Sequence, residues 1–135
     1  MHRHLSSCLL LVCLAACDSA AEIPNAAPSL AGVDALACAD ALCEVHLRVV
    51  DPDGDPVDLD IACVGEDGSP CTLRDEAGGD GSSGLVPDRA LPGRAHVLLL
   101  RVDGASPGSS VRLRLTPIDS HGLAGPAQTT ELVTL

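Results

Sequence analysis

Acidic residues gather in one short stretch of the chain. Asp51, Asp53 and Asp55 alternate with small turn residues, and Asp58 and Asp60 follow directly. Clustered carboxylates repel one another, and a bound cation relieves that repulsion. Calcium is a hard cation that takes about six to eight oxygen ligands, so this chemistry suits it. The sequence therefore predicts Asp51, Asp53 and Asp55 as candidate metal ligands, with calcium as the candidate cofactor.

The acidic stretch departs from the EF-hand pattern. That loop requires glycine at its sixth position, where this chain has Pro56, and it lacks the glutamate of the twelfth position as well. The alternative interpretation is a solvated turn that holds no metal. In that case Asp58 and Asp60 face Arg112 and Arg114 across neighbouring strands, and such exposed pairs contribute only tenths of a kcal/mol each, roughly.

No catalytic arrangement stands out in the sequence. The chain lacks a G-x-S-x-G elbow, an H-E-x-x-H zinc motif and a phosphate-binding glycine loop. His46 falls on the outer face of a predicted strand, His96 begins a buried one, and His121 lies in a loop. We therefore predict structural roles for the histidines and expect no enzyme activity.

The composition excludes several kinds of partner. The 135 residues include 19 acidic and 8 basic side chains, for a net charge of -11, which disfavours contact with nucleic-acid phosphates. The chain has no Phe, Trp or Tyr, so it has no stacking platform for bases or sugars. Its length allows one modest domain. We expect no nucleic-acid partner, and no specific biochemical activity follows from the composition.

The N-terminus combines a basic residue, Arg3, with an apolar run from Leu9 to Ala16. The run is shorter than the roughly 20 residues that cross a bilayer, and it is typical of a signal-peptide core. Its last residues, Leu14-Ala15-Ala16-Cys17, resemble the lipobox of bacterial lipoproteins. The resemblance implies that residues 1–16 are a cleaved lipoprotein signal peptide. It also implies a diacylglyceryl thioether on Cys17 and a fatty acid such as palmitate on the new amino group.

This resemblance implies a place in the bacterial cell envelope, facing the periplasm or the surface. The expected partners are the membrane, through the lipid anchor, and other envelope proteins. Asp18 resembles an inner-membrane retention signal of some enteric bacteria, but the rule varies between lineages and both membranes stay open. Residues 17–32 are rich in alanine and contain prolines, which predicts a lipidated, flexible linker before a domain over 33–135.

Four cysteines remain in the predicted domain: Cys38, Cys43, Cys63 and Cys71. An even number in an exported domain predicts two disulfides, for which three pairings exist. Short spacing favours Cys38–Cys43 and Cys63–Cys71. A nested alternative stays open, in which Cys43 pairs with Cys63 between two sheets and Cys38 pairs with Cys71. A four-cysteine zinc site is disfavoured, since the spacing does not match paired ligand knuckles.

Alternating apolar and polar residues predict β-strands from about Val33 onward. We expect strands over 42–50, 56–64, 95–102, 111–116 and 128–135, a short edge strand over 71–74, and one helical turn over 34–42. Segments rich in proline and glycine separate these strands. Such strands and turns predict an all-β fold, an antiparallel β-sandwich of about seven strands.

Two stretches resemble bacterial immunoglobulin-like extracellular domains and the cadherin-like and fibronectin-like modules of bacterial surface proteins. They are VHLRVVDPDGDPVDLDIACV (45–64) and VRLRLTPIDSHGLAGPAQTTELVTL (111–135). The resemblance implies an immunoglobulin-like sandwich that acts as a non-enzymatic spacer or protein-interaction module. The alternative is a calcium-stabilised, cadherin-like adhesion domain. Because the tryptophan and tyrosine corner of antibody domains are absent, the core must be aliphatic.

Overall fold

The computed structural model describes residues 23–135, and regular structure in this part consists of β-strands alone. The predicted signal peptide (1–16), Cys17 and Asp18 lie outside the described residues. None of the described residues belongs to a helix that is long and apolar enough to span a membrane. The strands are β1 (Ser29–Ala39), β2 (Leu42–Val50), β3 (Val57–Gly65), β4 (Pro70–Asp75), β5 (Arg94–Asp103), β6 (Ser110–Asp119), β7 (Gln128–Thr129) and β8 (Val133–Thr134). The predicted all-β class is confirmed.

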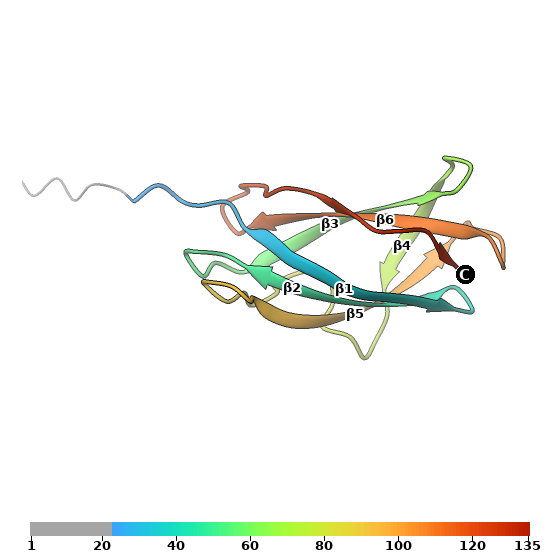
Figure 1. Cartoon of the computed structure of the whole chain (residues 1–135), viewed down its shortest axis with the longest axis horizontal. Coiled ribbons are helices and arrows are strands. Elements are labelled where there is room, and N and C mark those ends of the chain that lie inside the picture. The colour runs from blue at the N-terminus through green and yellow to red at the C-terminus, as the bar shows by residue number, and fades with distance from the viewer. Residues whose placement is uncertain (1–22) are drawn as a thin grey trace, which may run out of the picture.

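The strands form one antiparallel sheet in the order β1-β2-β5-β4-β3-β6-β7, with β8 also paired to β6. β4 pairs with β5 on one side and with β3 on the other, so it joins the two walls. The pairing therefore defines a continuous sheet that is nearly closed into a barrel, in place of two separate layers (Figure 1). The remaining gap lies between β1 and the short strands β7 and β8.

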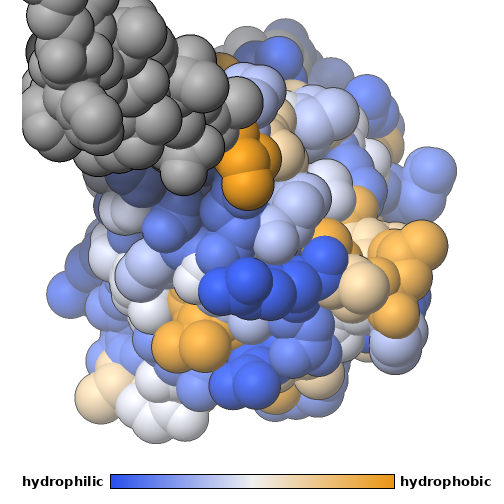
Figure 2. All heavy atoms as spheres, turned by 90° about the vertical axis from the view of Figure 1, so that its left-hand side faces the viewer, coloured by the Kyte–Doolittle hydropathy of each residue, from blue (hydrophilic) through white to orange (hydrophobic). Residues whose placement is uncertain are grey.

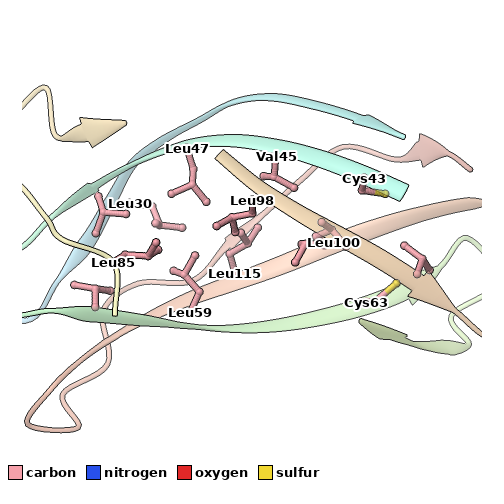
Figure 3. Packing of buried hydrophobic residues seen from close by; sticks show 14 of the residues in the cluster. Leu30, Cys43, Val45, Leu47, Leu59, Cys63, Leu85, Leu98, Leu100 and Leu115 are labelled. Carbon is pink, nitrogen blue, oxygen red and sulfur yellow. The ribbon is translucent and has the colours of Figure 1, made fainter. Parts of the chain in front are cut away.

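The core lies inside this sheet and is made of aliphatic and sulfur-containing side chains. Alternation along β2 buries Cys43, Val45, Leu47 and Val49, as predicted. The other strands add Val57, Leu59, Cys63, Leu98, Leu100, Val102, Val111, Leu113 and Leu115. These side chains point toward one another between the walls (Figure 3). With no aromatic residue in the chain, Leu and Val supply the apolar burial that stabilises the fold.

Two disulfides close local hairpins. Cys38 stands opposite Cys43 across β1 and β2, and Cys63 stands opposite Cys71 across β3 and β4. Residues directly opposite on antiparallel strands bring their Cβ atoms within reach of a disulfide. The local pairing is therefore the one that forms, and the nested alternative does not. Each bridge stabilises the fold by about 2–4 kcal/mol, mainly by restricting the unfolded chain.

The predicted helical turn over 34–42 is wrong, because β1 runs through most of it. Irregularities between Leu30 and Gly32 and between Val33 and Ala35 bend this strand. They leave Leu30, Val33 and Leu36 three residues apart, a spacing that imitates a helical face. β1 also begins at Ser29, inside the segment expected to be linker, and Leu30 reaches the core.

Two other strands differ from the prediction. β4 lies between β5 and β3 and is not at an edge. The expected strand over 128–135 is divided into β7 and β8 by Thr130. The hydroxyl of Thr130 accepts the N–H of Leu113, while its own N–H donates to the carbonyl of Leu113. The Thr130 hydroxyl thus accepts a hydrogen bond that a backbone carbonyl normally accepts between paired antiparallel strands.

Candidate metal centre

Four chain segments meet at one end of the barrel, which we call the acidic end: residues 23–28, 51–56, 86–93 and 120–127. β2 and β6 end here, whereas β1, β3 and β5 begin here (Figure 1). The antiparallel topology therefore brings together loops that are far apart in the sequence. The chain enters the barrel at this end, and its C-terminus lies at the other (Figure 1).

Asp51 is the buried centre of the turn between β2 and β3. Its side chain is 0% exposed, and its Oδ1 accepts the backbone N–H groups of Asp53, Gly54 and Asp55 at 2.9, 2.9 and 3.3 Å. Gly54 has a φ of 80°, which permits the tight turn that aims these N–H groups inward. The other oxygen, Oδ2, is also buried and has no hydrogen-bond partner among residues 23–135. A buried carboxylate oxygen in this state requires a positive partner or a proton donor.

The three aspartates that the sequence predicted as ligands do converge. Asp51, Asp53 and Asp55 each offer a carboxylate oxygen within 4.8 Å of the others. Asp53 Oδ2 also accepts the N–H of Ala26 at 2.7 Å, which ties the N-terminal segment to the turn. The three come from alternate positions of one turn, and Asp51 is buried while Asp53 and Asp55 are half-buried. The convergence that a cation site needs is therefore present.

A second group of ligand types adjoins the first. Asp119, at the end of β6, offers an oxygen within 4.8 Å of ligand atoms of Asp55 and His121. His121 Nδ1 lies 3.1 Å from Asp55 Oδ2. Asp55 belongs to both groups, so the two groups adjoin, and together they contain four carboxylates and one imidazole, which we call the carboxylate cluster. The sequence analysis did not predict Asp119 as a ligand. The Asp-x-x-Gly turn that begins at Asp119 and ends at Gly122 is the sequence feature that could have indicated it.

Asp119 is held in its ionised form by its surroundings. Its Oδ1 accepts the N–H groups of His121 and Leu123 at 2.9 and 2.8 Å, and its Oδ2 accepts the side-chain amide of Asn25. Burial raises the pKa of the Asp119 carboxyl, but these hydrogen bonds outweigh burial and hold the pKa below its ordinary value. A carboxylate that stays charged over a wide pH range suits a cation ligand.

The donor set fits calcium by its chemistry. Carboxylate oxygens are the ligands that calcium prefers, and the cluster supplies them from two loops. Pro56 ends the turn after its fifth residue, and Asp119 at the end of β6 brings a further carboxylate close to Asp55. Two basic side chains face the turn, His121 beside Asp55 and Arg89 beside Gly54. Arg89 lies so close above Gly54 that a Cβ there would come within 2.9 Å of its Nε, and its charge offsets part of the negative potential.

The other predicted residues take no part in the cluster. Asp58 and Asp60 lie on the outer face of β3, opposite Ile118 and Thr116. The predicted cross-strand pairing with Arg112 and Arg114 is wrong, because those arginines stand opposite Val64 and Ala62. Asp58 Oδ1 instead accepts the N–H of Gly84 at 2.7 Å.

The remaining histidines contact nearby acceptors on the barrel wall. His46 pairs with Glu44 on the outer face of β2. His96 is largely covered, with Nδ1 3.1 Å from Asp80 Oδ2 and Nε2 2.9 Å from the carbonyl of Val86. These contacts fix the connection between β4 and β5 to the wall. They agree with the structural roles predicted for these two residues.

Neither the models of known protein families nor the curated proteins compared with this chain give a match.

Proposed function

We propose that this protein is a lipid-anchored module of the bacterial cell envelope whose β-domain is stabilised by calcium. The observation that carries the calcium part is the buried Oδ2 of Asp51. It has no partner among residues 23–135, and the Asp51 carboxylate to which it belongs converges with those of Asp53 and Asp55. A cation at this position satisfies the buried oxygen and removes the repulsion among the aspartates.

The calcium ion would join three segments of the acidic end. Asp51, Asp53 and Asp55 belong to the β2–β3 turn, and Asp119 belongs to the end of β6. Asn25 and Ala26 already donate to two of these carboxylates, so the N-terminal segment belongs to the same network. Any ion that binds the folded state alone raises its stability, by about 2.7 kcal/mol at one hundred times the dissociation constant. The site therefore serves to fix the point at which the chain enters the domain.

An immunoglobulin-like or cadherin-like sandwich is the finer description that we propose for the fold. β1-β2-β5 forms one wall and β3-β6-β7 the other, with β4 between them. This order supports an immunoglobulin-like arrangement, in which the first, second and fifth strands face the third, sixth and seventh. Fold alone does not define an activity. We propose a non-enzymatic role because the sequence contains none of the catalytic motifs considered above.

The lipid anchor is carried by Leu14-Ala15-Ala16-Cys17. Small residues before the cysteine fit a narrow protease groove, and the thiol accepts the diacylglyceryl group. Several acyl chains hold a protein on a membrane durably, whereas a single chain does not. Mass spectrometry of the native protein tests this part. We expect a chain that begins at an acylated Cys17, and an unmodified thiol with residues 1–16 attached would contradict it.

Thermal unfolding tests the calcium part. We expect calcium to raise the melting temperature of the mature protein relative to chelator, by roughly 4 °C or more for each kcal/mol of stabilisation. Asp55→Asn should abolish this difference, because Asp55 belongs to both ligand groups. Asp60→Asn is the matched control, since Asp60 is an exposed aspartate of the next strand outside the cluster. Equal melting temperatures of the wild type in calcium and in chelator would contradict the proposal.

A second candidate is a metal-free spacer or protein-interaction module, and the gap beside β1 favours it. A groove of about 380 Å³ follows this gap and includes Val33, Leu36, Leu132 and Val133 among its lining residues. Edge strands next to such a groove accept an extended segment of a partner by backbone hydrogen bonds. Crosslinking in native membranes tests this role. A partner joined at β1 or β8 supports it, and crosslinks confined to other surfaces oppose it.

A further inference from the structure

The acidic end also carries most of the exposed apolar side chains. Among residues 23–135, five large hydrophobic residues are notably exposed, and four of them lie at this end: Ile23, Val86, Leu91 and Leu123. Leu91 is 76% exposed and Leu123 is 41% exposed. Viewed from this side, the surface shows apolar patches set among hydrophilic residues (Figure 2). Apolar side chains concentrated on one end of a small acidic domain indicate a surface that contacts something.

Leu91 and Leu123 lie on loops that flank the carboxylate cluster. The loop of Leu91 is joined to the turn by a hydrogen bond from the N–H of Asp51 to the carbonyl of Asp88, at 2.9 Å. Arg89, two residues before Leu91, lies over Gly54 of the same turn. On the other side, the N–H of Leu123 donates to Asp119 Oδ1. Both exposed leucines therefore belong to loops that are hydrogen-bonded to residues of the candidate cation site.

The length of the N-terminal chain limits what this end can face. Eight residue steps separate Cys17 from Asn25, whose side chain donates to Asp119, and an extended chain covers about 28 Å in that number of steps. If Cys17 carries the lipid, the acidic end stays within that distance of the membrane surface. This step rests on the lipid anchor of the proposed function. The opposite end of the barrel, with the loop over 104–109, is directed away from that point of attachment (Figure 1).

We propose that the acidic end is a calcium-dependent docking surface for the lipid bilayer to which the chain is anchored. Without calcium, the aspartates repel anionic headgroups. With calcium bound, the ion neutralises the cluster and takes a lipid phosphate oxygen as a further ligand. Leu91, Leu123 and Val86 then bury their side chains in the interface, and Arg89 contacts a second phosphate. The lipid anchor keeps the domain near the membrane, and calcium binding determines whether the acidic end docks on the bilayer.

A tryptophan placed at the docking surface tests this inference directly, because the chain contains no aromatic residue of its own. The full lipidated protein with Leu91→Trp is incorporated into vesicles of phosphatidylcholine and phosphatidylglycerol, with bromine on the phosphatidylcholine acyl chains. We expect calcium to shift the tryptophan emission to shorter wavelength and to quench it, and chelator to reverse both changes. Ser106→Trp, on an exposed loop at the opposite end, is the control and should respond to neither addition.

The outcomes separate this inference from the proposed function. Docking is supported if quenching at position 91 requires calcium and is lost in the Leu91→Trp, Asp55→Asn double variant. It is overturned if calcium raises the melting temperature without vesicles but leaves the tryptophan unquenched, and in that case the metal site stands alone. Equal quenching at positions 91 and 106, or a blue shift that needs no vesicles, also overturns it. If calcium changes neither the melting temperature nor the emission, both proposals fail.

Discussion

At the scale of single residues, the acidic end is built around carboxylates whose charge is partly satisfied. Asp51 accepts three backbone N–H groups with one oxygen and leaves the other buried without a partner among the described residues. Asp119 accepts two backbone N–H groups and one side-chain amide. Backbone donors alone can organise such a cluster, but they do not neutralise its charge. The backbone N–H groups hold the carboxylates in place, but their negative charge is not balanced. We infer a cation for this reason.

The pH dependence of stability follows from Asp119. The pKa of Asp119 is lower in the folded state than the ordinary aspartate value of about 4. Its ionised form therefore stabilises the fold fully at pH values above that ordinary value. The contribution is lost as the pH falls toward the folded-state pKa. In chelator, we therefore expect the free energy of unfolding to decline on acidification below about pH 4–5. Asp119→Asn should be less stable near neutral pH and should show a flatter decline. Denaturant unfolding at several pH values checks this, and a variant as acid-sensitive as the wild type would oppose it.

At the scale of elements, strand faces could be predicted from the sequence, but strand partners could not. β2, β3 and β6 alternate so regularly that their buried faces follow from the residue types. The register between β3 and β6 depends on long-range packing, and it placed Asp60 opposite Thr116 and not opposite an arginine. β1 escaped prediction because its irregularities disturb the period of two.

The same limit applies to the candidate site. Asp51, Asp53 and Asp55 could be predicted because a single turn contains all three. Asp119 and Asn25 come from segments more than ninety residues apart that meet only in the fold, as their hydrogen bond shows. Nothing in the local sequence around either residue indicates the other. Contacts of this range arise from the whole topology, which single-sequence patterns do not specify.

The junction between the N-terminal segment and the β6–β7 loop gives a prediction at this scale. A Cβ on Gly125 would lie 1.8 Å from the carbonyl oxygen of Pro28, so alanine there must displace the N-terminal segment. We expect Gly125→Ala to lower the free energy of unfolding by about 1–3 kcal/mol and to weaken calcium binding, since Asn25 and Ala26 move with Pro28. Denaturant unfolding and calcium titration measure the two effects. Ser120→Ala, on the exposed surface of the same loop, should leave both unchanged. Wild-type values for Gly125→Ala would show that this contact is dispensable.

At the scale of the whole molecule, the two ends of the domain's long axis differ in the features that they carry. The entering chain, the carboxylate cluster and most exposed apolar residues lie at one end, and the C-terminus lies at the other (Figure 1). The wall between the ends is fixed by antiparallel pairing and by two hairpin disulfides. A rigid barrel of this kind keeps the acidic end and the opposite end at a constant separation. This arrangement suits the lipid-anchored module that we propose.

Isothermal titration of calcium into the mature protein is the most direct test of this account. We predict saturable binding of one ion per chain, loss of that binding in Asp55→Asn, and its retention in Asp60→Asn. The absence of saturable heat in the wild type would contradict the account. Equal binding by the two variants would contradict it as well, since the ion would then lie outside the cluster that Asp51, Asp55 and Asp119 define.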